Sequence, residues 1–190
     1  NNSERKCMSE ISIDLILVLI AAFGAGLIDA MVGGGGLVQL PALFAFYPNV
    51  APPVLLGTNK FAGIFGTASA VWRYAQRVAI PWRALMPLAL YVLLASVGGA
   101  VLATRVAPEV FRPLVPIMLA AVLVYTVWHK NLGAGHAPRA FSGQHHLVGA
   151  LAVTAIGFYD GFFGPGTGSL LMLVFVRCYG FDLLHAAASA

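Results

Sequence analysis

Charged side chains are scarce in this sequence: Asp, Glu, Lys and Arg make up only 9% of its 190 residues, and 59% are hydrophobic. Water-soluble domains carry about 25% charged and about 45–50% apolar residues. A soluble chain of this length could not keep so much apolar surface away from water. The composition therefore predicts an all-α fold, that of a polytopic helical membrane protein. The net charge of +4 does not indicate affinity for nucleic acid, because its carriers lie between apolar runs.

Cysteine is equally rare, with Cys7 in a polar stretch and Cys178 in an apolar one. A disulfide framework is therefore not expected. Residues 1–10 are too polar and acidic for the start of a secretory signal, so no cleaved signal peptide is predicted. The chain lacks nucleotide-binding glycine loops, and the adjacent His145 and His146 fit a solvated loop better than a metal site. We predict no enzyme activity, no cofactor and no metal.

One motif, a carboxylate in an apolar run ahead of a glycine-rich break, occurs twice. Residues 26–36 read Gly-Leu-Ile-Asp-Ala-Met-Val-Gly-Gly-Gly-Gly, and residues 157–168 read Gly-Phe-Tyr-Asp-Gly-Phe-Phe-Gly-Pro-Gly-Thr-Gly. The two aspartates, Asp29 and Asp160, are 131 positions apart (160 − 29), and the copies align at this offset without a gap. Duplicated, interrupted apolar helices that carry a charge are typical of secondary transporters. We therefore predict two repeats, the first over residues 1–131 and the second, incomplete, over residues 132–190.

Apolar runs of helical length divide the chain. The first of these runs, residues 11–32, has 22 residues and is long enough to span about 30 Å of hydrocarbon. Small residues at Ser96, Gly98 and Gly99 predict close helix packing. We expect short pieces at 37–47 and 168–179, a proline-rich turn at 48–57, longer helices at 58–75, 85–103, 110–128 and 147–163, and a further helix starting within 181–190.

Arginine and lysine indicate which side of the membrane each connection faces. The stretches 73–83 and 129–146 carry basic residues and no acid, so both are expected in the cytoplasm. The short apolar piece at 37–47 either crosses the membrane or re-enters it. The first case makes the repeats inverted and the second makes them parallel, and the sequence leaves both open.

The first glycine break is a candidate binding site. Glycine at mid-membrane exposes backbone groups that must face protein or a water-filled cavity, and the N-terminus of the helix that follows attracts an anion. The alternative is a glycine hinge that only permits tight packing. The predicted substrate-binding residues of the two breaks are Gly33, Gly34, Gly35, Gly36, Gly164, Gly166 and Thr167.

Thr58, Asn59 and Lys60 complete the predicted substrate site. They follow the proline-rich turn and are expected to open a helix. A lysine there places a cation beside a helix N-terminus, which the helix dipole disfavours and an anionic ligand would neutralise. Two alternatives remain open: Lys60 extends to the membrane surface, or it pairs with Asp29.

The two aspartates are candidates for coupling or gating. An ionised carboxylate at mid-bilayer is costly, so such residues usually face a pathway or a partner. We interpret Asp29 and Asp160 as acids that accept a proton or form a gate. The alternative is a structural ion pair or a cap of the broken helix.

At these residues the chain resembles the TauE/SafE family of membrane transporters, also called the sulfite exporter family. The resemblance lies in residues 26–37, 40–43, 57–60 and 157–169 and extends over nearly the whole chain. It implies a multi-pass permease of the inner (cytoplasmic) membrane, built from two repeats, that handles small sulfur-containing or organic anions. A coupling proton or cation and a homodimer are compatible with it. Against the family pattern, we expect this chain to stop inside the second repeat.

Two other classes stay open. One is a non-transporting membrane scaffold or assembly subunit. The other is an intramembrane aspartyl protease, because Tyr159-Asp160 and Pro41-Ala42-Leu43 echo elements of that group. The order of those elements is reversed here, and Ile28 stands where the protease motif has glycine.

Overall fold

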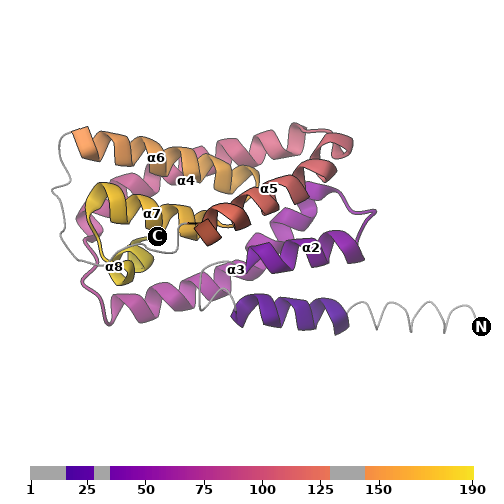
Figure 1. Cartoon of the computed structure of the whole chain (residues 1–190), viewed down its shortest axis with the longest axis horizontal. Helices are drawn as coiled ribbons and strands as arrows, with labels where there is room; N and C mark the ends of the chain where they lie inside the picture. Colours follow the sequence, from indigo (N-terminus) through magenta and orange to yellow (C-terminus); the bar gives the residue numbers. More distant parts are fainter. Residues whose placement is uncertain (1–15, 28–34, 129–143) are drawn as a thin grey trace, which may run out of the picture.

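The computed structural model describes residues 16–27, 35–128 and 144–190 (Figure 1). Every regular element in these ranges is a helix, so the predicted all-α class is confirmed. The first is the apolar helix Ile16–Leu27. It is followed by α2 (Gly36–Phe46), α3 (Pro52–Ala75), α4 (Trp82–Arg105), α5 (Pro108–Trp128), α6 (Gln144–Phe162), α7 (Thr167–Tyr179) and α8 (Leu183–Ser189).

The start of α3 differs from the prediction. We expected the proline-rich turn to run to residue 57, whereas α3 begins at Pro52 with proline at its first positions. Proline's fixed φ and missing N–H suit the first helical turn, so the two prolines begin the helix instead of extending the turn. Lys60 therefore lies about two turns inside α3. The prediction that it sits at a helix N-terminus, beside the positive end of the dipole, is wrong.

The helix starts repeat at the offset of the sequence motif. The short helices α2 and α7 begin at Gly36 and Thr167, directly after the two glycine breaks. The next helices, α3 and α8, begin at Pro52 and Leu183. Both pairs of starts are 131 positions apart (167 − 36 and 183 − 52). The duplication read from the glycines therefore extends to the helices that follow them.

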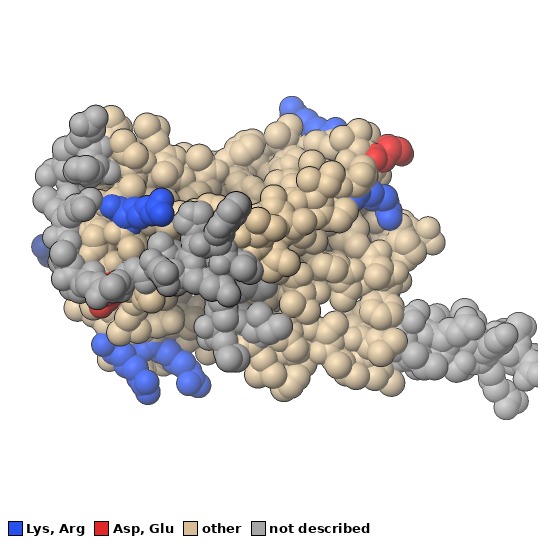
Figure 2. Space-filling model, viewed as in Figure 1, with Lys and Arg blue, Asp and Glu red and all other residues tan. Residues whose placement is uncertain are grey.

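Two of the described helices are long and apolar enough to cross a membrane. They are Trp82–Arg105 and Pro108–Tyr125, with mean hydropathies of 2.1 and 1.5. The pair α7 and α8 passes the same test together and bends by 120° at its break, as a broken span or a re-entrant loop does. On the face that Figure 2 shows, charged side chains of the described residues lie toward the two ends of the long axis, and the described surface between them carries none. This distribution is that of a protein whose middle faces lipid.

Helices α4 and α6 lie side by side in close contact (Figure 1). A Cβ atom added to Gly161 of α6 would lie 1.8 Å from the carbonyl oxygen of Ser96, and one added to Gly99 of α4 would lie 2.1 Å from that of Phe158. The backbones approach this closely only because glycine has no side chain. The predicted close packing at Ser96 and Gly99 is confirmed, and it joins a helix of the first predicted repeat to one of the second.

Phe163 fixes the position of the second glycine break. It directly precedes Gly164, and only 1% of its surface is exposed. It packs in a buried apolar cluster with Leu40 of α2, Leu55 of α3 and Phe111 of α5. Within a membrane such a contact stabilises through van der Waals packing, because lipid is as apolar as the buried side chain. The break is therefore held against the helices of the first predicted repeat.

Candidate functional site

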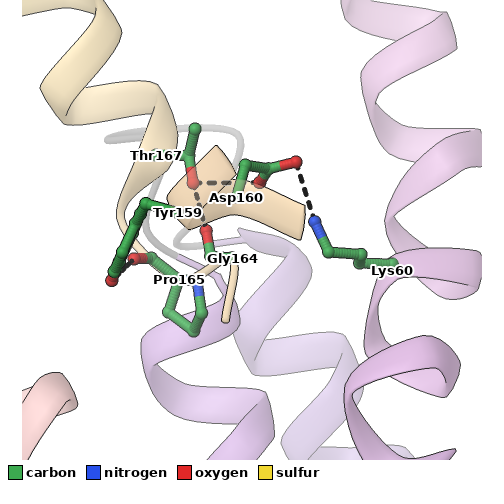
Figure 3. Close-up of polar contacts among 6 residues, drawn as sticks. All are labelled: Lys60, Tyr159, Asp160, Gly164, Pro165 and Thr167. Atoms are coloured by element: carbon green, nitrogen blue, oxygen red, sulfur yellow. Dashed lines mark hydrogen bonds and ion pairs between the residues drawn. The ribbon is translucent and has the colours of Figure 1, made fainter. Parts of the chain in front are cut away.

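An ion pair joins the two predicted repeats at the breaks. Nζ of Lys60, in α3, lies 2.8 Å from Oδ2 of Asp160, in α6 (Figure 3). The two residues are 100 positions apart in the sequence. Among the described residues, the partner of Lys60 is the aspartate of the second motif. The pairing of Lys60 with Asp29, which the sequence left open, is not tested. Asp29 itself lies outside the described residues.

The second oxygen of Asp160 contacts α7. Oγ1 of Thr167, the first residue of α7, lies 2.9 Å from Oδ1 of Asp160. The same hydroxyl is also in hydrogen-bonding contact with the carbonyl oxygen of Gly164 (Figure 3). One carboxylate thus connects the lysine of α3 to the helix that starts after the second break.

Glycine is required twice in the second break. Gly164 and Gly166 have φ values of +99° and +79°, in the left-handed region that favours glycine. The chain turns there sharply enough to bring Thr167 back to Asp160. The hydroxyl of Tyr159 donates a hydrogen bond of 2.8 Å to the carbonyl oxygen of Pro165, which supports the turn from within.

Gly164 also makes room for the lysine. A Cβ atom added at this position would lie 3.2 Å from both Cε and Nζ of Lys60, tighter than most real contacts. Gly166 instead faces α5, where an added Cβ would lie 2.1 Å from Cγ1 of Val122. The first of these predicted site residues therefore borders the ion pair, and the second serves the packing of the break.

The first break meets the second at this point. A Cβ atom added to Gly36, at the start of α2, would lie 3.4 Å from Nδ2 of Asn59 and 3.6 Å from Cα of Pro165. Gly35 is buried and immediately precedes α2. The structure thus brings together Gly36, Asn59, Lys60, Asp160, Gly164 and Thr167, drawn from both copies of the motif.

Other predicted residues behave differently. The hydroxyl of Thr58 donates to the carbonyl oxygen of Val54, one turn earlier in α3, at 2.9 Å, so it is used within its own helix. Gly33 and Gly34, like Asp29, lie outside the described residues. The hydrogen bond from Tyr159 to the second break was not predicted from the sequence. Its position beside Asp160, in the helix that ends at the break, was the available signal.

The ion pair is partly exposed. The side chains of Lys60 and Asp160 are 37% and 31% exposed, respectively. An ammonium offers three N–H donors, and the carboxylate occupies only part of that capacity. The neighbouring amide of Asn59 and hydroxyl of Thr167 can also donate. A small group with several acceptor oxygens can therefore compete with Asp160 for Lys60. Within the described ranges, no three His, Cys, Asp or Glu residues gather where they could hold a metal ion.

Comparison with known families gives one match over most of the chain. Residues 18–190 match the family described as sulfite exporter TauE/SafE. No solved structure was found to match.

Three relatives carry similar names. A Sinorhizobium protein named probable membrane transporter protein ORF9 is 40% identical over 179 residues, which cover 92% of this chain and 65% of that protein. A Haemophilus influenzae probable membrane transporter protein is 36% identical over 182 residues, covering 95% and 70%. The probable membrane transporter protein YfcA of Escherichia coli K12 is 33% identical over 174 residues, covering 92% and 63%. The chain spans about two thirds of the length of these relatives.

Proposed function

The chain belongs to the sulfite exporter TauE/SafE family of membrane transporters, and from this premise we propose that it moves a small oxyanion, sulfur-containing or organic, across the cytoplasmic membrane. The observation that carries the proposal is the position of Lys60. Its ammonium lies where the two glycine breaks meet, between Asp160 and Gly164. Duplicated broken helices place substrate sites at such junctions in secondary transporters.

The donors around Lys60 suit an oxyanion. Lysine is a compact point charge with three donors, and the amide of Asn59 and the hydroxyl of Thr167 lie in the same cluster. Hydrogen bonds from a charged donor are roughly twice as strong as neutral ones. An oxyanion presents several acceptor atoms and can use these donors together, and its charge adds the attraction of the ammonium.

The depth of the ion pair also supports a transport site. Lys60 precedes the end of α3 by 15 residues (75 − 60), and Asp160 follows the start of α6 by 16 residues (160 − 144). At 1.5 Å per residue both lie about 22–24 Å along their helices. The end of α3 and the start of α6 are at the same end of the molecule (Figure 1). On the other side, the start of α3 at Pro52 is 8 residues (60 − 52), or about 12 Å, from Lys60, so the lysine lies in the interior of its helix, away from both ends.

Flux into proteoliposomes tests the proposed function. Vesicles containing the purified protein should accumulate sulfite or sulfoacetate faster than protein-free vesicles, and should leave a neutral solute of similar size unchanged. Lys60→Met should abolish the difference. Arg105→Met, at the end of α4, removes a positive charge remote from the breaks and should keep it. Equal uptake with and without protein, for every oxyanion, would contradict the proposal and favour the alternative of a membrane scaffold.

A further inference from the structure

We propose that Asp160 couples transport to a proton: the anion takes the place of Asp160 beside Lys60, and the released carboxylate binds a proton from water. This inference rests on the proposed anion site and adds a mechanism by which the anion binds to Lys60 and is released from it. The pair that must separate is the one between Nζ of Lys60 and Oδ2 of Asp160, at 2.8 Å.

Charge balance in the site is the first argument. Lys60 and Asp160 together carry no net charge. An anion that joined them without a counterion would leave one uncompensated negative charge between apolar helices, which is costly. An anion that binds together with one proton leaves the site neutral, because the new Lys60–anion pair replaces the old pair and Asp160 becomes a neutral acid. Loading then moves one proton for each monovalent anion.

The hydrogen bonds of Thr167 are the second argument. Its hydroxyl has one hydrogen and two acceptors within reach, Oδ1 of Asp160 and the carbonyl oxygen of Gly164. When Asp160 is ionised, Thr167 donates to Oδ1. When Asp160 is protonated at Oδ1, the acid donates to Oγ1 of Thr167, and Thr167 turns its hydrogen to Gly164. Rotation of one hydroxyl thus satisfies both protonation states, which only a group that donates and accepts can do.

Lys60 is the charged residue that contacts Asp160, and the other described residues around this carboxylate are neutral. On α4, the residues that pack against this part of α6 include Ser96 and Gly99, which do not ionise. On α7, Asp160 contacts the hydroxyl of Thr167. On α6 itself, the hydroxyl of Tyr159 donates its hydrogen bond to the carbonyl oxygen of Pro165. Among the residues that the structure describes, Lys60 is the one cation that forms an ion pair with Asp160. A carboxylate that leaves Lys60 therefore has no other ion-pair partner among the described residues.

Linkage gives the expected observation. If one proton binds with each anion, the affinity for a monovalent anion rises as the pH falls, by about tenfold per pH unit over the range in which the proton is taken up. Asp160→Asn replaces the carboxylate by a neutral amide of the same shape. In this variant Lys60 no longer has a competing partner, so anion binding should be independent of pH and at least as tight as in the wild type at low pH.

Isothermal titration of the purified protein with methanesulfonate, whose single charge does not change over the pH series, tests this. The expected result is a pH-dependent affinity in the wild type and in Glu109→Gln, which removes an exposed acid of α5, and a flat profile in Asp160→Asn. A flat wild-type profile, or an unchanged slope in Asp160→Asn, would overturn the coupling while leaving the anion site intact. No binding at any pH would overturn the anion site and this inference with it.

Thr167 supplies a second test that spares the ion pair. Thr167→Val removes a donor to ionised Asp160, so the decline of anion affinity should begin at a higher pH. Thr167→Ser keeps the hydroxyl and should retain the wild-type profile. Thr154→Val removes a hydroxyl that bonds only within α6, to the carbonyl oxygen of Ala150, and is the matched control. Identical profiles for Thr167→Val and Thr167→Ser would contradict the proposed exchange of hydrogen bonds.

Discussion

Lys60 and Asp160 belong to different copies of a duplicated pattern, and their side chains meet at 2.8 Å. The lysine follows the first glycine break and the aspartate precedes the second. Gly36 of the first break and Pro165 of the second lie against each other beside this pair. The site therefore needs residues from both copies.

The packing of α4 on α6 gives the first prediction. In Gly161→Ala the new Cβ would meet the backbone carbonyl of Ser96, which cannot move away as a flexible side chain can. The two helices must separate, and we expect a loss of about 1–3 kcal/mol, as for other overpacked cores. Thermal unfolding in detergent measures it. Gly63→Ala in α3, where nothing lies within 4 Å of the added Cβ, is the control and should unfold no earlier than wild type. Equal unfolding temperatures for both variants would contradict the observed packing.

The second break gives another prediction. Gly164→Ala forces a side chain into a left-handed backbone conformation and toward Nζ of Lys60. Anion affinity should fall several-fold in titration calorimetry, because the lysine is displaced. Gly57→Ala, in α3 with open space around the added Cβ, should bind as the wild type does. If Gly164→Ala also binds normally, Gly164 has no part in positioning Lys60.

Tyr159 should stabilise the break through one hydrogen bond. Tyr159→Phe removes the donor to the carbonyl oxygen of Pro165 and should cost about 1 kcal/mol. Amide hydrogen exchange at Gly164, Gly166 and Thr167 should accelerate, because the turn loses its internal support. Tyr91→Phe, at an exposed position of α4, should leave exchange and stability unchanged. Unaltered exchange in Tyr159→Phe would show that the glycines alone hold the turn.

The arginines at the end of α3, at the start of α4 and between these helices predict the orientation in the membrane. Arg73, Arg77 and Arg83 lie in a stretch without acid, so this end of the molecule should face the cytoplasm. A single cysteine at Gln76, in a protein whose native cysteines are replaced, should resist an impermeant thiol reagent added to intact cells. A cysteine at Glu109, in the first turn of α5, should react. The reverse pattern would invert the proposed orientation.

Sequence reasoning located the helices and the breaks because glycine, proline and apolar length act locally. The offset of 131 positions, read from glycines, recurs in the starts of α2, α7, α3 and α8. The start of α3 was misplaced because two prolines fit a turn as well as a first helical turn, and only packing decides between them.

The partner of Lys60 could not be chosen from the sequence. The duplication makes Asp29 and Asp160 equivalent in pattern, and the contact between Lys60 and Asp160 depends on how α3 packs against the second break. Thr58 was expected at the ligand, but a threonine inside a helix can donate to the carbonyl four residues earlier, and it does. The substrate-binding and coupling roles given to all the predicted site residues stay predictions, and Asp29, Gly33 and Gly34 lie outside the described residues.

The central claim is that Lys60 holds the transported anion, and calorimetric titration of the purified protein with sulfite tests it most directly. Wild-type protein should bind, and Lys60→Met should lose at least about tenfold in affinity, since a charged hydrogen-bonding partner contributes about 1.5–3 kcal/mol. Lys60→Arg should recover only part of this, because the guanidinium is larger and planar beside Gly164. Sulfite affinity in Lys60→Met equal to that of the wild type, in protein that is folded, would remove Lys60 from the site and contradict the account.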